Sequence, residues 1–423
     1  VISYLIVEHN KGGDKRSADG IVITPSHNPP QDGGFKYNPP HGGPADIEET
    51  TWIQDRANQL IHSKKAGIKR IAYERARQAP TTHEKDFITP FVESLSHIID
   101  MDIIQKEGIR IGVDPMGGAG VHFWNPVAER YNLSLEVVNP NTDPTFGFMT
   151  VDSDGEIRMD CSSPYAMTNL VALAHRFDIS WGNDPDVDRH GIVCPTGLMN
   201  PNHYLSVAIW YLLNNRPNWK ATLSVGKTLV TSSMIDKIVL GLNRTLYEVP
   251  VGFKWFVQGL LNRTIAFGGE ESAGASFLRK DGTVWSTDKD GFSSTLLAAE
   301  IVAKTGKTPD EIYRDILVPQ YGDPFYKRID GPITDEQKVI LKSLTPDSIK
   351  TPTIAGLAIT NIMTTAPGNG ALIGGVKAVL NDGSWCAIRP SGTEAKMKIY
   401  IESFGGETLW YQIYNELFPL IFE

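Results

Sequence analysis

The sequence contains little cysteine, no long apolar run and no excess of basic residues. Its cysteines, Cys161, Cys194 and Cys386, lie far apart, which argues against a disulfide framework or a zinc site and favours reduced thiols in a cytoplasmic protein. No apolar stretch approaches the length of a membrane span, so we expect no membrane partner and no signal peptide. The net charge of -9 argues against a nucleic-acid partner. An anionic ligand must therefore be bound by local cations.

The chain also lacks an initiator methionine, and residues 1–7 are typical of the middle of a buried helix or strand. We therefore expect that part of the first domain precedes Val1. Apolar strand-like runs alternate with amphipathic stretches along the chain, which predicts an α/β fold. At about 150 residues per domain, the 423 residues indicate about three domains or a few smaller ones.

Four apolar runs each lead into a polar loop that carries glycine or proline. These runs are 21–24 before Ser26, 179–182 before Asp184, 265–267 before residues 268–272, and 385–388 before residues 389–394. In open α/β sheets, ligands bind at the carboxyl ends of strands. The four loops are therefore expected to line one cleft between domains.

The first loop, Thr-Pro-Ser-His-Asn-Pro at 24–29, would hold a serine hydroxyl on a stiff turn at the end of a strand. Such a hydroxyl can act as a nucleophile and carry a phosphoryl group. Taken alone, the loop is better explained by a proline-stiffened turn in which a Ser or Thr side chain bonds its own backbone, and only the other loops favour the nucleophile. His27 and Lys36 are equally ambiguous, since isolated histidines and lysines on loops are more often solvated.

The second loop, Asp-Pro-Asp-Val-Asp-Arg at 184–189, spaces three carboxylates two residues apart. In an extended loop this spacing turns all three to one side, as an oxygen cage for Mg²⁺ requires. A calcium-binding EF-hand is excluded, because Arg189 and Pro195 occupy the positions that require glycine and glutamate. An acidic capping turn is the competing structural interpretation. A held serine and a held cation together indicate phosphoryl transfer.

Together with Gly-Glu-Glu-Ser at 269–272 and Arg-Pro-Ser-Gly-Thr-Glu at 389–394, these loops resemble the four active-site loops of the α-D-phosphohexomutases, in the same order. Residues 249–254 and 286–291 most resemble the bacterial phosphoglucomutases of that family. The resemblance implies a four-domain α/β architecture with mixed sheets around a central cleft. Its domains would span 1–88 (incomplete), 89–198, 199–322 and 323–423. The family's upstream Thr-Ser-Gly-x-Arg loop is missing from this sequence, so its arginine is not assigned.

The resemblance also implies an activity, the interconversion of glucose 1-phosphate and glucose 6-phosphate. The expected route passes through a phosphorylated Ser26 and a glucose 1,6-bisphosphate intermediate. One Mg²⁺ would be held by Ser26, Asp184, Asp186 and Asp188. The further catalytic residues would be His27, Lys36, Arg189 and Lys289, and the substrate would be bound by Lys254, Glu270, Ser272, Arg389, Ser391, Gly392 and Thr393.

Several of these assignments have open alternatives. The acidic loop at 269–272 could instead cap a helix. Lys289 would need a lowered pKa to act as a base, whereas Asp288 and Asp290 would raise it unless they point elsewhere. A mannose or glucosamine mutase, a hydrolase and a non-enzymatic paralogue are the competing functions. Nucleotide binding is disfavoured: Gly226-Lys227-Thr228 lacks the earlier P-loop glycine, and the glycines at 117–120 lack the dinucleotide spacing. We expect a monomer or homodimer.

Overall fold

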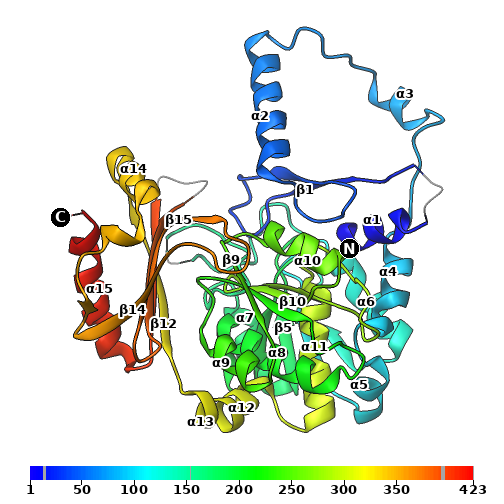
Figure 1. Ribbon diagram of the computed structural model, residues 1–423. Coiled ribbons are helices and arrows are strands. Elements are labelled where there is room, and N and C mark those ends of the chain that lie inside the picture. The colour runs from blue at the N-terminus through cyan, green and yellow to red at the C-terminus, as the bar shows by residue number, and fades with distance from the viewer. Residues whose placement is uncertain (13–15, 153, 392–395, 423) are drawn as a thin grey trace.

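The computed structural model describes residues 1–12, 16–152, 154–391 and 396–422. Within these residues the strands form four sheets, which follow one another along the chain and carry helices on their faces (Figure 1). The predicted α/β class with mixed sheets is confirmed. The domain boundaries given above remain predictions. Among the described helices, none combines the length and apolar character needed to cross a membrane.

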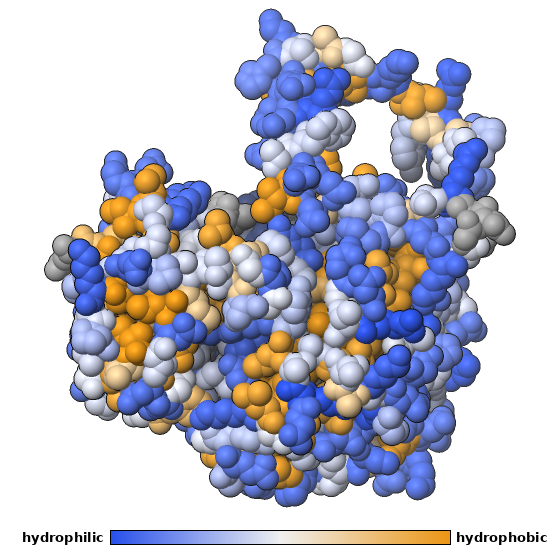
Figure 2. All heavy atoms as spheres, in the orientation of Figure 1, coloured by the Kyte–Doolittle hydropathy of each residue, from blue (hydrophilic) through white to orange (hydrophobic). Residues whose placement is uncertain are grey.

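The first sheet is a two-stranded antiparallel hairpin beside the body of the molecule. Its part of the chain comprises α1 (Ile2–Asn10), β1 (Gly20–Thr24), β2 (Gly34–Asn38), α2 (Ile47–His62) and α3 (Tyr73–Arg77). Helices α2 and α3 form an arm that projects away from the body (Figure 1). The visible surface of the arm is largely hydrophilic (Figure 2). Ser26 follows β1 directly, and Lys36 lies within β2.

The second sheet has five strands in the order β4-β3-β5-β6-β7. The elements here are α4 (Ile88–Ser94), α5 (Met101–Glu107), β3 (Ile111–Asp114), α6 (Val121–Tyr131), β4 (Leu135–Val137), α7 (Thr168–Ala172), β5 (Ile179–Gly182), β6 (Gly191–Cys194) and β7 (Gly197–Leu198). Strands β3, β4 and β5 are parallel, and β3 and β5 are buried along their whole length, as expected for strands covered on both faces. The aspartate loop follows β5, at its carboxyl end.

The third sheet has the order β11-β10-β8-β9. It is built with α8 (Pro201–Asn215), β8 (Ser224–Thr228), α9 (Met234–Gly241), β9 (Leu246–Val249), α10 (Val257–Leu261), β10 (Ile265–Glu270), β11 (Gly274–Phe277), α11 (Gly291–Thr305), α12 (Pro309–Ile312) and α13 (Val318–Tyr321). Asn200 caps α8 ahead of Pro201, and Asp290 caps α11 by accepting from the Phe292 N–H. The loop at 269–272 joins antiparallel β10 and β11.

The fourth sheet is antiparallel throughout, in the order β12-β17-β16-β15-β14-β13. Its elements are β12 (Phe325–Pro332), α14 (Asp335–Ser343), β13 (Thr353–Ile354), β14 (Leu357–Thr365), β15 (Leu372–Leu380), β16 (Trp385–Pro390), β17 (Lys396–Ser403) and α15 (Gly406–Phe422). It forms a separate lobe at one side of the molecule (Figure 1). Arg389 lies near the end of β16.

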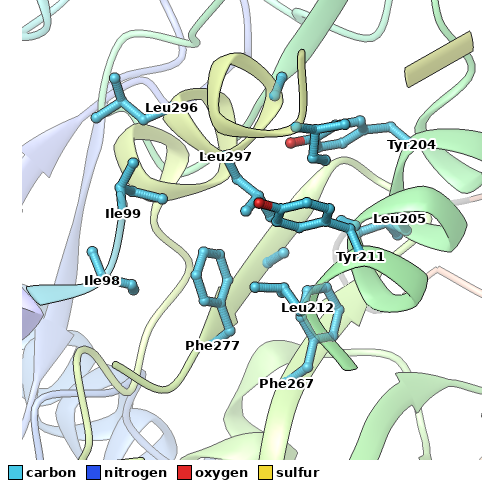
Figure 3. Close-up of a cluster of buried hydrophobic side chains, with 14 of the residues drawn as sticks. Ile98, Ile99, Tyr204, Leu205, Tyr211, Leu212, Phe267, Phe277, Leu296 and Leu297 are labelled. Atoms are coloured by element: carbon cyan, nitrogen blue, oxygen red, sulfur yellow. The ribbon is translucent and has the colours of Figure 1, made fainter. Parts of the chain in front are cut away.

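One hydrophobic core runs through the second and third sheet regions. Helices α8 and α11 and strands β10 and β11 pack there with Ile98 and Ile99 (Figure 3). A buried ion pair of the third-sheet region lies where the two regions meet: Arg216 Nη1 and Nη2 lie 2.7 and 2.9 Å from the two carboxylate oxygens of Glu300. Arg216 Nη2 also donates to the Ile98 carbonyl at 3.1 Å. The Asp100 N–H also donates to Glu300, at 2.9 Å. These two parts of the chain are therefore held together by packing and by hydrogen bonds to a buried ion pair.

We expect Arg216→Met to destabilise the protein, because removing one partner leaves the Glu300 carboxylate buried without its counter-charge. The expected cost is about 3–5 kcal/mol, measured as a lower midpoint of thermal unfolding. Lys307→Met is the control, because Lys307 and Asp315 form an exposed pair at 3.3 Å, and surface pairs contribute little. Equal midpoints for the two variants would contradict the prediction.

Candidate active site

Ser26 lies in a turn whose backbone is strained. Its φ is 55°, in the left-handed region where a residue with a Cβ loses roughly 1–2 kcal/mol. The Thr24 side chain stabilises the turn by accepting a hydrogen bond from the Ser26 N–H at 2.8 Å. The Ser26 hydroxyl is half-buried and lies 3.3 Å from His27 Nδ1. The turn therefore holds this hydroxyl beside an imidazole, at the end of β1.

The aspartate loop brings three carboxylates together by a route other than the predicted one. The sequence predicted an extended loop, whereas residues 185–187 turn and Val187 has a φ of 55°. Asp184 Oδ1 closes the turn by accepting from the N–H groups of Asp188 and Arg189, at 3.1 and 3.0 Å. The three carboxylates converge because of this turn, and each offers a ligand oxygen within 4.8 Å of the other two.

The charge of this cluster fits a small cation. Asp184 Oδ2, Asp186 Oδ1 and Asp188 Oδ1 are buried, and no hydrogen-bond donor among the described residues reaches them. Burial raises the pKa of Asp184, and the charges of Asp188 and Asp186 raise it further. An all-oxygen donor set with buried, unpaired lone pairs is what Mg²⁺ prefers. The residues present therefore fit the predicted metal.

Two glycines allow the backbone to pack against this loop. A Cβ on Gly118 would lie 2.2 Å from Pro185 Cα, and one on Gly291 would lie 2.5 Å from the Arg189 carbonyl oxygen. The neighbouring backbone also bonds the loop, since the Gly291 N–H donates to the Val187 carbonyl at 2.9 Å. The aspartate loop is thus clamped between the start of α11 and the loop before α6.

Cations from other parts of the chain surround the aspartates. Lys36 Nζ lies 2.6 Å from Asp186 and 3.0 Å from Asp188, and Lys289 Nζ lies 3.0 Å from Asp188. Burial alone would raise the pKa of Asp188, but Lys289 and Lys36 outweigh it and hold that pKa well below its usual value. Arg189 extends to the loop at 269–272, called the sugar-side loop below, where its Nη1 donates to the Ser272 carbonyl at 3.1 Å.

The pKa of Lys289 decides whether this residue can act as a base. Asp288 and Asp290 do point elsewhere, toward Asn38 and Trp285 at 3.0 and 2.6 Å. Burial alone would lower the pKa of Lys289, but the charges of Asp188 and Glu270 raise it overall. In this arrangement Lys289 is a cation and an acid, and it becomes a base only when Asp188 is neutralised by another partner.

The loop at 269–272 leads into strand β11, so the helix-capping alternative is wrong. Glu270 is buried and accepts a hydrogen bond from the Gly252 N–H at 3.1 Å. Gly252 stands two residues before Lys254 in the chain. Glu271 accepts from Thr228 Oγ1 at 3.0 Å. Both carboxylates are therefore held at the ends of strands of the third sheet, where they can accept hydrogen bonds from hydroxyl groups.

The Arg389 loop belongs to the fourth sheet. The Ser391 N–H donates to the Lys396 carbonyl at 2.7 Å and closes the loop, while Gly392 and Thr393 lie outside the described residues. Burial raises the pKa of Tyr400, the Glu271 carboxylate adds to the rise, and Arg389 opposes it. Tyr400 therefore lies within electrostatic reach of both the sugar-side loop and the Arg389 loop.

Arg189 joins the second and third predicted loops directly, and Lys36 of β2 joins the hairpin that carries the first loop to the second. A cavity of about 680 Å³ opens there, lined in part by Thr24, Lys36, Asp186 and Lys289. Sequence reasoning missed Asp160. The pKa of His27 is lowered to about 4, first by burial and then by the charge of Arg189, while Asp160 opposes both. Asp160 thus lies within electrostatic reach of His27, yet only a lone acid in Asp-Cys-Ser-Ser marked it. Thr228 and Gly252, which hold the glutamates, were also missed.

Comparison with known proteins now identifies the family. Residues 1–63, 89–197 and 200–319 match phosphoglucomutase/phosphomannomutase α/β/α domains I, II and III. A phosphoglucomutase of Komagataeibacter xylinus is 56% identical over 405 residues, covering 96% of this chain and 73% of that protein. The chain belongs to the phosphoglucomutase/phosphomannomutase family. The resemblance seen in the sequence is confirmed.

Solved structures of the family show the same fold. Parafusin, a phosphoglucomutase from Paramecium, superposes with a TM-score of 0.72 at 21% identity, covering 99% of this chain and 79% of that one. The N-acetylphosphoglucosamine mutase of Aspergillus fumigatus, solved with GlcNAc-6P and magnesium, gives a TM-score of 0.61 at 14% identity, covering 99% and 92%. At these identities the likeness concerns the fold alone.

We expect Asp186→Asn to weaken Mg²⁺ binding, because it removes one of three charges from a site whose affinity depends on ligand charge. Isothermal calorimetry with magnesium chloride measures the loss, expected to be tenfold or more. Asp102→Asn, an exposed change on α5, is the matched control. Unchanged affinity in Asp186→Asn would remove Asp186 from the metal site.

Proposed function

We propose that the protein is a phosphoglucomutase that interconverts glucose 1-phosphate and glucose 6-phosphate. The main support is the 56% identity to a phosphoglucomutase over 96% of the chain. The described residues supply the chemistry that this reaction needs: a half-buried serine, three converging carboxylates and several cations around them. The substrate is a phosphosugar, and a cytoplasmic monomer or homodimer is the proposed form.

Ser26 carries the phosphoryl group. In the first half-reaction the P–O bond to Ser26 Oγ breaks and a bond from phosphorus to sugar O6 forms, so the O6 proton leaves and Oγ is protonated. The proton that O6 loses balances the proton that Oγ gains. His27 is suited to deliver the proton at Oγ because its Nδ1 lies 3.3 Å away. Lys289 serves the sugar side: in its neutral form it accepts the O6 proton as a base, and in its cationic form it returns a proton as an acid in the reverse step. The product is glucose 1,6-bisphosphate.

Charge on the transferring group is balanced by cations. Lys36 and Lys289 reach the aspartate cluster from other elements, and Arg189 belongs to the aspartate loop. These three cations neutralise the phosphoryl oxygens. Asp184, Asp186, Asp188 and one oxygen of phosphorylated Ser26 would hold Mg²⁺. When bound, the ion supplies positive charge to the developing transition state.

The substrate's two ends are recognised by different loops. The sugar hydroxyls form hydrogen bonds with Glu270, Ser272 and Lys254. The phosphate that is not reacting is bound by Arg389, Ser391, Gly392 and Thr393. The bisphosphate then turns over within the cleft, its C1 phosphate returns to Ser26, and glucose 6-phosphate leaves. The Glu-Glu-Ser sequence at 270–272 favours glucose over mannose or glucosamine. The intact serine and aspartates argue against a non-enzymatic paralogue.

We expect Ser26→Ala to lower mutase activity by several orders of magnitude, since the variant has no hydroxyl to carry the phosphoryl group. The coupled assay of glucose 6-phosphate formation measures this, with Ser63→Ala on the exposed surface as the control. Ser26→Gly tests the fold separately, because glycine accepts a φ of 55° without strain. Near-normal turnover in either Ser26 variant would refute the mechanism.

Arg389→Ala separates a mutase from a hydrolase. Because the bisphosphate reverses end for end, the variant should raise KM for both sugar phosphates together, by about tenfold or more. It should also release bisphosphate and leave dephosphorylated enzyme, which added glucose 1,6-bisphosphate rescues. The exposed Arg314→Ala is the control. Release of inorganic phosphate in step with turnover, with no effect of added bisphosphate, would favour a hydrolase.

A further inference from the structure

Four charged side chains meet in the interior, where the third and fourth sheets join. Lys227 lies on β8, Asp236 on α9, Glu248 on β9 and Lys377 on β15; we call them the junction network. The side chains of Lys227 and Lys377 are only 1% and 3% exposed. Lysines are almost never buried to this degree unless they are paired.

The junction network is closely paired. Lys377 Nζ lies 3.0 Å from Glu248 Oε1 and donates to the Leu229 carbonyl at 2.6 Å. Lys227 Nζ lies 2.6 Å from Asp236 and 3.5 Å from the same oxygen of Glu248. Burial alone would raise the pKa of Glu248, but the two ammonium groups outweigh it and lower that pKa to about 2. Two cations thus balance two anions across the joint.

Each strand of the junction network leads to a loop of the active site. Lys227 directly precedes Thr228, whose hydroxyl holds Glu271. Glu248 stands at the end of β9, a few residues before Gly252, whose N–H holds Glu270. On the other side of the joint, Lys377 pairs in register with Ala387 of β16, two residues before Arg389. One pairing therefore links the supports of the sugar-side loop and the phosphate loop.

Backbone contacts bring the two sheets close at the same place. The Gly368 N–H, in the hairpin between β14 and β15, donates to the Glu248 carbonyl at 2.8 Å. The Tyr326 hydroxyl of β12 donates to the Val230 carbonyl at 3.0 Å. A shift of the fourth sheet would therefore separate Lys377 from Glu248, leaving Lys377 without its carboxylate and Glu248 with Lys227 alone.

Stability alone does not require charges here. Apolar side chains of similar volume usually support a protein as well as a buried ion pair does, whereas a half-removed pair is costly. A buried ion pair adds geometric specificity instead. Its charges are paired in one relative placement of the two strands and are left without partners, at a cost in free energy, in others. An apolar contact is more tolerant of sliding.

We propose that Lys377 is a positioning residue, which acts through Glu248 to set the distance between the Arg389 phosphate loop and the sugar-side loop. The inference rests on the proposed mutase function, in which one cleft must hold the bisphosphate in two opposite orientations. A fixed distance between the loops retains the intermediate while it turns over. Lys377 itself touches neither the reacting atoms nor the substrate.

The test compares three variants of the full-length enzyme. Lys377→Met leaves Glu248 with one counter-ion fewer, and Lys377→Met/Glu248→Leu replaces the interdomain pair by apolar groups and leaves Lys227 balanced by Asp236. Arg216→Met is the matched control, because it breaks an equally buried ion pair at the other joint. For each protein, the thermal midpoint, kcat, KM for glucose 1-phosphate and bisphosphate released per turnover are measured.

We expect Lys377→Met to lower the thermal midpoint and the double variant to restore most of it. Both should raise KM roughly three- to thirtyfold, the range of couplings carried through packed networks, and release more bisphosphate, with kcat at saturating bisphosphate within about twofold of wild type. Arg216→Met should lose stability without releasing bisphosphate. If Lys377→Met does not fold, the double variant alone carries the test.

A double variant with wild-type KM and wild-type retention of bisphosphate would overturn the inference, since the pair would then be structural only. Release of bisphosphate by Arg216→Met would overturn it as well, because any loosening would suffice. Failure of the proposed function is a separate result. It would appear as a wild-type enzyme that does not interconvert the two glucose phosphates, whatever the variants do.

Discussion

The site depends on mutual compensation of buried charges. Asp184, Asp186 and Asp188 can lie together because Lys36 and Lys289 approach them from two other parts of the chain, while Arg189 adds a third cation from the same loop. Separate burial of such groups would be prohibitively costly. The hairpin, the second sheet and the third sheet are therefore fixed relative to one another by the same charges that we propose for phosphoryl transfer. The contacts that complete the fold therefore also complete the site.

Part of this arrangement could be read from the sequence. Ser26 and Asp184 each follow a strand, and the spacing of the three aspartates marked the carboxylates that the structure brings together. The α/β class followed from alternating strand-like and amphipathic stretches. These inferences succeed because they rest on local order, in which an apolar run ends and a polar loop begins. The family resemblance then supplied the order of the loops.

The remainder depends on contacts between distant residues. Nothing local indicates that Lys36 lies 2.6 Å from Asp186, or that Glu270 contributes to the raised pKa of Lys289. Val187 was unpredictable for another reason, because a β-branched residue is disfavoured at its φ of 55°, and tertiary contacts impose that conformation. Lys227 looked like the remnant of a nucleotide motif and turned out to be a buried half of an ion pair. Its partners lie on other elements.

The clamp formed by Gly118 and Gly291 around the aspartate loop affects how the protein can vary. Neither glycine has a side chain to offer a substrate or a metal, yet a single methyl group at Gly118 would meet the backbone of Pro185 at 2.2 Å. Such a change would move the aspartates without altering one of them. During evolutionary drift these two positions are therefore as restricted as the acids they adjoin. A natural variant at either could abolish activity while every functional group remained intact.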